Sequence, residues 1–156
     1  MALVRILVDG YGLLQSWPAL APGKSRHSEG AREELINHLT QYFDATATPL
    51  TIVFDGATAP FDPAVHPTSA DVEVVFSRPG QTASQLIERL GRKLSSQGDF
   101  LVATPAAALR ETMKLPRCAL ATPEQFIQTV ETTLADLERE IEKINEKEKR
   151  KFTYHG

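Results

Sequence analysis

The sequence predicts an α/β domain in which helices cover a mostly parallel sheet of four or five strands. Short apolar runs that suit buried strands recur along the chain, and segments with helical periodicity separate several of them. The runs are continuous rather than alternating, which is typical of strands buried on both faces. A chain of 156 residues, with 42% hydrophobic and 24% charged residues, is long enough to bury one core.

The first half of the chain contains two predicted strands and one predicted helix. Residues 3–8 form a β-branched strand, and a loop with several glycines and prolines follows as far as residue 28. Ser28 or Glu29 begins a helix that ends near residue 45, because apolar residues recur there at helical spacing. The second strand covers 50–56. The proline-rich stretch after it, 57–71, predicts a long loop of the kind that is usually functional or disordered.

The second half supplies the remaining strands of the predicted sheet. In chain order we expect a strand at 72–77, a helix at 81–98, a strand at 100–105, a short helix at 106–115 and an edge strand at 117–121. Cys118 lies in the last of these segments, where an apolar setting predicts a small core residue.

A long helix is predicted from Pro123, because proline is favoured in the first turn of a helix. Apolar residues then recur at alternating spacings of four and three, which is a heptad seam. We expect its first part to pack on the domain and the rest to enter solvent, with self-pairing or docking on a partner protein as alternatives. The predicted division is a domain at 1–137 and a charged helical extension at 138–156. The seam residues are Val130, Leu134, Leu137, Ile141 and Ile144.

Composition excludes several classes of protein. The net charge of −3 and the pI of about 5.8 exclude a polybasic nucleic-acid coat, so we expect no DNA partner and only local contacts with RNA. A single cysteine excludes an internal disulfide and suits a reducing compartment. No signal peptide or membrane-spanning run is recognisable, and a cytoplasmic location is therefore predicted.

Two carboxylates follow the first two predicted strands. Asp9 ends the run LVD and Asp55 ends VFD, and a glycine follows each. In a parallel sheet the carboxyl ends of neighbouring strands share one edge, where ligands bind. Carboxylates facing one cleft suit Mg²⁺, which prefers oxygen ligands. Aspartate is also common after strands because it caps turns, and the sequence leaves both interpretations open.

Four sequence blocks together resemble the YacP-like NYN family, a branch of the PIN-like ribonucleases. The blocks are LVDGY, VFDG, VVFSRPGQTASQLIERL and LVATP, and the resemblance covers roughly residues 3–135. It implies a three-layer, Rossmann-like α/β/α fold and, in active members, Mg²⁺- or Mn²⁺-dependent endoribonuclease chemistry. Some members are thought to act on mRNA at the ribosome. It also implies RNA or the ribosome as a partner.

The chain departs from the family pattern at acidic positions. The T-A-D motif of relatives is Thr82-Ala83-Ser84 here, and the A-T-x-D motif ends on Ala106. The asparagine that relatives often have in D-G-Y-N is Gly12. Ser84 near the start of a helix is predicted to be its N-cap. We therefore expect Asp9 and Asp55 to be a remnant site that holds Mg²⁺ or Mn²⁺ weakly.

Other acids are candidates for the missing ligands. Glu88 lies one helical turn after Ser84 and could face the same cleft. Asp71 is a further candidate. The four histidines have no ligand spacing and are predicted to bind no metal.

Basic and aromatic residues define a candidate RNA surface. Tyr11 could stack on a base, whereas Trp17 is predicted to pack on the core beneath its loop. Scattered arginines on helices can also be a solvated face, so this surface is a hypothesis. The basic candidates are Arg78, Arg89, Arg92 and Lys93 around the 81–98 helix, with Arg110, Lys114 and Arg117 after the fourth strand.

Three functions remain open from the sequence. The first is an RNA- or ribosome-binding protein with lost or impaired metal-dependent cleavage. The second is an active Mg²⁺- or Mn²⁺-dependent endoribonuclease in which another acid replaces those missing. The third is an interaction protein that acts through its C-terminal helix.

Overall fold

The computed structural model describes residues 2–56, 70–107, 109 and 114–153, and it contains a five-stranded parallel sheet. The strand order is β3-β2-β1-β4-β5, and every neighbouring pair is parallel. The predicted fold class and the predicted edge strand are confirmed. The strands are β1 Arg5–Asp9, β2 Leu50–Phe54, β3 Val72–Phe76, β4 Phe100–Ala103 and β5 Cys118–Ala121.

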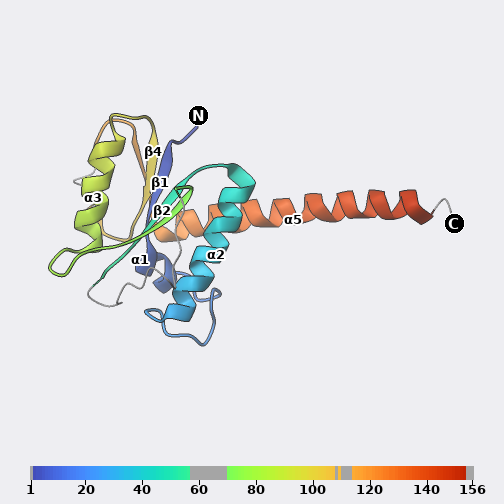
Figure 1. Ribbon diagram of the computed structural model, residues 1–156, viewed down its shortest axis with the longest axis horizontal. Helices are drawn as coiled ribbons and strands as arrows, with labels where there is room; N and C mark the ends of the chain where they lie inside the picture. The colour runs from blue at the N-terminus through green and yellow to red at the C-terminus, as the bar shows by residue number, and fades with distance from the viewer. Residues whose placement is uncertain (1, 57–69, 108, 110–113, 154–156) are drawn as a thin grey trace.

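Helices cover both faces of the sheet (Figure 1). One face carries α1 Gly10–Gln15, α2 Glu29–Thr46 and the first part of α5 Pro123–Thr153, which pack on one another. The other face carries α3 Ala83–Leu94, which contacts β1, β2 and β4. The result is a three-layer α/β/α sandwich.

The three central strands β1, β2 and β4 each supply side chains to two separate cores. Ile6 and Val8 of β1 pack in the core under α2, whereas Leu7 between them packs in the core under α3. All three are at most 1% exposed. This alternation follows from the two-residue period of a strand. It explains why the strand sequences are continuously apolar rather than alternating.

The loop predicted after the first strand is wrong in its first part, because residues 10–15 form α1. Asp9 is the N-cap of this helix, and its side chain accepts a hydrogen bond from the backbone N–H of Gly12. Leu13 and Leu14 of this helix are fully buried in the core. The sequence does not predict the helix because two of its six residues are glycines, which have a low helix propensity. Burial of its side chains in the core outweighs that low propensity.

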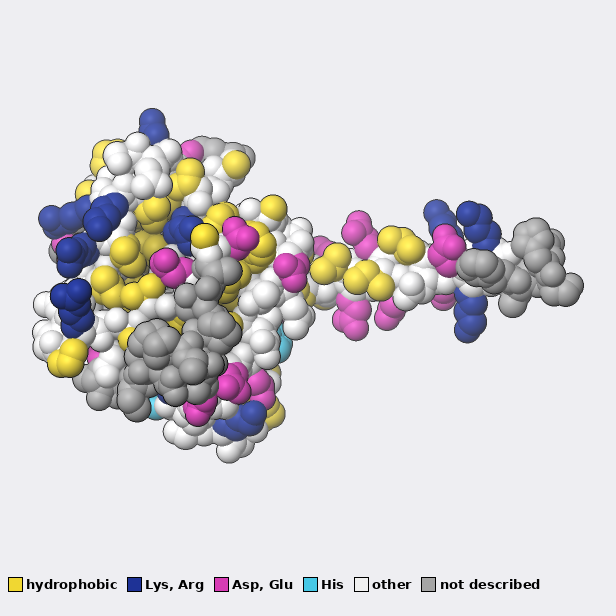
Figure 2. All heavy atoms as spheres, in the orientation of Figure 1, with side chains coloured by type: hydrophobic (Ala, Val, Ile, Leu, Met, Phe, Trp, Pro, Cys, Tyr) yellow, Lys and Arg dark blue, Asp and Glu magenta, His cyan; other side chains and the backbone are white. Residues whose placement is uncertain are grey.

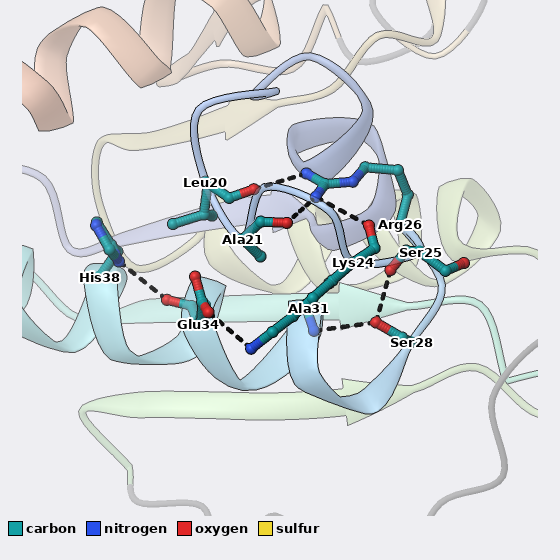
Figure 3. A network of polar contacts seen from close by, with 9 residues as sticks. All are labelled: Leu20, Ala21, Lys24, Ser25, Arg26, Ser28, Ala31, Glu34 and His38. Atoms are coloured by element: carbon teal, nitrogen blue, oxygen red, sulfur yellow. Dashed lines mark hydrogen bonds and ion pairs between the residues drawn. The ribbon is translucent and has the colours of Figure 1, made fainter.

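The connection between α1 and α2 is organised by one guanidinium group. Arg26 donates five hydrogen bonds to backbone carbonyls at distances of 2.5–3.2 Å. Figure 3 shows three of these, to Leu20, Ala21 and Lys24; the other two acceptors are Leu14 and Trp17. We call residues 16–28 the Arg26 loop. Because its carbonyls converge on one cation, this long connection adopts a defined path without regular secondary structure.

The N-cap predicted for α2 is confirmed, whereas the one predicted for α3 is not. α2 begins after Ser28, whose hydroxyl accepts from the Ala31 N–H as predicted. The predicted N-cap of α3 is wrong: Thr82 caps the helix, in a capping box with Gln85, and Ser84 lies inside the first turn. The predicted loop at 57–69 and most of the short helix predicted at 106–115 lie outside the described residues.

α5 begins at Pro123, as predicted, and Thr122 with Gln125 forms a capping box before it. Phe126, Ile127 and Val130 are buried against the domain, and Leu134 packs partly on it. The helix continues without a break through residue 138, and residues 138–151 are exposed (Figure 1). Among the described residues, no helix is long and apolar enough to cross a membrane.

Candidate functional site

A pocket opens at the sheet edge where the strand order reverses, between β1 and β4. In open α/β sheets this is where ligands bind. Asp9 is the last residue of β1 and lies opposite Val53 of β2, so Asp55 follows two residues further along the same edge. The pocket has a volume of about 250 Å³. Its lining includes Asp9, Gly12, His27, Asp55, Ser84 and Pro105.

The two predicted carboxylates therefore lie together at the start of α3, as expected. Burial raises the pKa of Asp9 above its ordinary value, the hydrogen bond from the Gly12 N–H lowers it, and the nearby Asp55 charge raises it again. The N–H of Gly12 lies 3.0 Å from Asp9 Oδ1. Ionised Asp9 is thus desolvated and repelled by its neighbour, a state that a bound cation would relieve.

Asp9→Asn should raise the thermal midpoint at pH 7 by about 1–3 °C in metal-free buffer. Because the pKa of Asp9 is raised in the folded state, ionised Asp9 destabilises the folded protein when the pH lies above that pKa. This destabilisation is lost as the pH falls through the folded pKa, so the variant's advantage should shrink towards pH 4. Asparagine keeps the cap, since its amide oxygen also accepts from Gly12. Differential scanning fluorimetry across this pH range measures the effect.

The control for this experiment is Asp71→Asn, at an exposed position, which should shift the midpoint much less at either pH. Adding Mn²⁺ should stabilise the unmodified protein more than Asp9→Asn. If Asp9→Asn lowered the thermal midpoint at pH 7 while Asp71→Asn left it unchanged, ionised Asp9 would not destabilise the folded protein.

The two positions that lack their acids have different surroundings. Ser84 lines the pocket from the first turn of α3. Ala106 is half-buried against the core under α3, and its N–H donates to the Thr104 hydroxyl at 3.2 Å. Of the two, Ser84 is the position from which a carboxylate would point at Asp9 and Asp55 without leaving an apolar contact.

Gly12 and Pro105 fill one space together. A Cβ at position 12 would lie 2.6 Å from Cδ of Pro105 and 3.0 Å from Cγ of Asp9. Any side chain there, including the asparagine of the family motif, requires Pro105 to move. Glycine at position 12 and proline at position 105 therefore depend on each other, because their packing leaves no room for the asparagine of the family motif. The proline ring also narrows the pocket on the β4 side.

The substitute acids predicted from the sequence do not join the site. Glu88 pairs with Arg92 on α3 at 2.6 Å and is not among the residues found to line the pocket. Asp71 precedes β3 and so lies at the opposite edge of the sheet, which makes that alternative wrong. His27 lines the pocket instead. Its sequence context gave no signal, because the Arg26 loop alone brings it there.

Tyr11 lines the pocket, but most of its ring is covered, and its stacking on a base stays a prediction. The side chain is 6% exposed and lies between His27 and Phe54, with ring centroids 4.4 and 5.0 Å away. Its hydroxyl accepts a hydrogen bond from buried Arg32 at 3.3 Å. Trp17 is 5% exposed, which confirms its predicted core position.

The predicted basic residues of α3 are exposed and gather on one side of the molecule (Figure 2). Arg78 precedes α3, whereas Arg89, Arg92 and Lys93 lie in the second half of the helix. Arg117 directly precedes β5 and so lies at the other edge of the sheet. Arg110 is outside the described residues. The basic surface therefore follows α3 away from the pocket.

A Rossmann-like α/β/α sandwich with carboxylates at its switch point is the architecture of the NYN domains within the PIN-like ribonuclease superfamily. The chain belongs to the YacP-like NYN domain family, whose model matches residues 6–155. Proteins with NYN domains are typically metal-dependent nucleases. The resemblance predicted from the sequence blocks is confirmed.

Three matches, one to a protein sequence and two to crystal structures, all from Bacillus subtilis, support this assignment. The uncharacterized protein YacP of strain 168 is 28% identical over 140 residues, which is 89% of this chain and 82% of YacP. The crystal structure of Rae1 (YacP) has a TM-score of 0.77 at 27% identity, over 95% of this chain and 84% of that one. A point mutant of Rae1 gives a TM-score of 0.76 at 28% identity, over 93% and 84% of the two chains.

Proposed function

We propose that this protein binds RNA, free or within the ribosome, with the pocket at the β1–β4 switch point and the basic surface of α3, and that its metal-dependent cleavage is lost or impaired. The observation that carries this proposal is the acid content of the pocket. Among the described residues, its lining contains two carboxylates, Asp9 and Asp55, while the T-A-D position is Ser84. Among the described residues no group of three or more metal-binding side chains is found.

A divalent cation fits this pocket weakly. Asp9 and Asp55 would each offer oxygen ligands, and the pKa of Asp9 is raised mainly by burial and further by the Asp55 charge, so a bound cation would stabilise the ionised form. With two carboxylates most ligands would be water, which Mg²⁺ tolerates and which lowers affinity. In an active nuclease such an ion makes water nucleophilic near neutral pH. Here Asp9 and Asp55 would hold the ion, and Ser84 would contribute only a neutral hydroxyl.

The RNA backbone has a route from the pocket along α3. Arg78, Arg89 and Lys93 are exposed; Arg78 precedes α3, and the other two lie in the second half of this helix, whose length is about 18 Å at 1.5 Å per residue. Arg92 pairs with Glu88, which reduces its availability. Phosphate contacts by such residues position RNA without reading its sequence. We therefore expect binding that depends strongly on salt and weakly on sequence.

Binding of a short single-stranded RNA, followed by fluorescence anisotropy at several salt concentrations, tests this proposal. The triple variant Arg78→Ala/Arg89→Ala/Lys93→Ala should bind about tenfold more weakly at low salt. Its slope of log affinity against log salt should fall by about 2, since each phosphate contact to a single strand contributes about 0.7.

The matched control removes the same charge elsewhere. Arg139→Ala/Lys143→Ala/Lys149→Ala on α5 should leave both affinity and slope close to those of the unmodified protein. If both triple variants weaken binding equally, the RNA surface is not on α3. If the unmodified protein does not bind RNA at low salt, the proposal fails.

An active endoribonuclease is the second candidate, because metal-dependent cleavage is typical of the family. His27, which lines the pocket, is the residue that this candidate would use beyond the carboxylates, since an imidazole can act as a general acid or base. The two candidates share the binding surface and differ in whether bound RNA is cut.

A further inference from the structure

The part of α5 beyond the domain carries an apolar stripe that nothing in the described chain covers. Ile141 is 48% exposed and Ile144 is 59% exposed, and Leu137 precedes them by one turn on the same side. Large exposed apolar side chains on a surface helix are unusual unless another surface covers them. The stripe is therefore a candidate contact surface.

The stripe continues the seam that holds α5 on the domain. Val130 is buried in the core under α2 and partly buried Leu134 packs against that core, and the same heptad positions further along are Leu137, Ile141 and Ile144. The next two seam positions are Glu148 and Lys151, where the apolar seam ends. An isolated helix with so short a seam is marginal in water, so a second helix is needed to bury it.

The charges flanking the stripe are separated along the helix. Figure 2 shows acidic and apolar side chains together along the part of the helix nearer the domain, and basic ones towards the far end. Residues 138–142 contain three glutamates and one arginine, whereas 147–151 contain four basic residues and one glutamate. A parallel pair of such helices would place like charges together. An antiparallel pair would place each acidic segment against a basic one.

One antiparallel register satisfies both the apolar stripe and the charges. If Ile141 of one copy faces Ile144 of the other, the two isoleucine pairs lie at the centre of the contact. Glu140 then lies opposite Lys147 of the second copy, because both occupy the same heptad position and these positions face each other in antiparallel pairs. The twofold symmetry forms this contact twice. In a parallel pair Glu140 would face Asn145 instead, and no such attraction would form.

The base of α5 also suits the end of a second copy in this register. A groove of about 340 Å³ lies where α5 leaves the domain, and it is lined by Leu20, Leu134 and the acids Glu34, Glu131 and Glu138. Glu34 also pairs with Lys24 at 2.8 Å. Leu134 would lie opposite Lys151 of the second copy, whose aliphatic stem can cover it while the ammonium reaches Glu131 or Glu138.

We propose that the occupant of this surface is a second copy of the same chain, and that residues 134–151 of two α5 helices form an antiparallel, twofold-symmetric pair. The contact is isologous, so it closes at two copies and gives no filament. It places the two domains at opposite ends of the pair. This inference does not depend on whether the pocket binds RNA.

Sedimentation equilibrium of the full chain tests the proposal, with about 100 µM protein as the upper concentration. The unmodified protein should populate a dimer, and Ile141→Glu/Ile144→Glu should be a monomer throughout. Thr129→Glu/Thr132→Glu adds the same charge at exposed positions off the seam and should remain dimeric. The far-ultraviolet circular dichroism of both variants should show the domain folded. A monomeric unmodified protein at the upper concentration would overturn the proposal.

A charge exchange tests the antiparallel register. Glu140→Lys and Lys147→Glu should each weaken the dimer about tenfold, because each replaces two attractive contacts by two repulsive ones. The double variant restores opposite charges across the pair and should recover the original affinity within about threefold. If the isoleucine variant is monomeric but the single charge variants associate as tightly as the unmodified protein, the antiparallel register is wrong.

Discussion

Ser84→Asp should raise the affinity of the pocket for Mn²⁺ by about tenfold or more, because it adds a third carboxylate to Asp9 and Asp55. The position lies in the first turn of α3, where a negative charge is favoured by the helix dipole. The substitution leaves the cap intact, since Thr82 is the N-cap. Without metal the variant should be less stable than the unmodified protein, because three like charges then share one pocket.

The gain should appear as a larger Mn²⁺-induced rise in thermal midpoint and, with Ala106→Asp added, as RNA cleavage at least about 10²-fold above the unmodified protein. Ser96→Asp, at an exposed position after the other end of α3, is the matched control and should change neither property. If Ser84→Asp binds Mn²⁺ no more tightly than Ser96→Asp, the pocket is not a latent metal site.

Arg26→Ala should lower the free energy of unfolding by about 2–3 kcal/mol, the largest single effect on stability that we expect outside the apolar cores. The guanidinium donates to four carbonyls of the Arg26 loop and to that of Leu14 in α1, and the half-buried ones among them regain only part of that interaction from water when they lose a charged donor. His27 follows Arg26 directly, so the pocket wall should loosen together with the loop.

Urea denaturation measures this loss. Arg26→Lys should fall between the unmodified protein and Arg26→Ala, because one ammonium cannot reach all five carbonyls. Arg139→Ala removes the same side chain from an exposed pair with Asp136 on α5 and should change stability by less than about 0.5 kcal/mol. Equal effects of Arg26→Ala and Arg139→Ala would show that the loop does not depend on its guanidinium.

Much of the fold follows from the sequence because the deciding signals are local. The continuous apolar strands, the Ser28 cap and Pro123 of α5 each depend on neighbouring residues, and all are confirmed. The placement of Asp9 and Asp55 at one edge also follows from the sequence, because parallel neighbours align their carboxyl ends.

The features that the sequence does not predict depend on distant contacts. α1 forms because Leu13 and Leu14 reach the core, and this outweighs the two glycines in its short segment. Tyr11 is buried partly because His27, which lies in the Arg26 loop, packs against its ring. Thr82, not Ser84, caps α3, a difference of two residues that moves the hydroxyl of Ser84 from a backbone role to the pocket lining.

Cleavage of a labelled RNA by the purified protein, in Mn²⁺ and in EDTA, tests the central claim most directly. Because the pocket offers two carboxylates and a neutral Ser84, we expect RNA to be bound but no more cleavage in Mn²⁺ than in EDTA. Efficient cleavage by the unmodified protein that both EDTA and Asp9→Asn abolish would contradict the account and establish an active metal-dependent endoribonuclease.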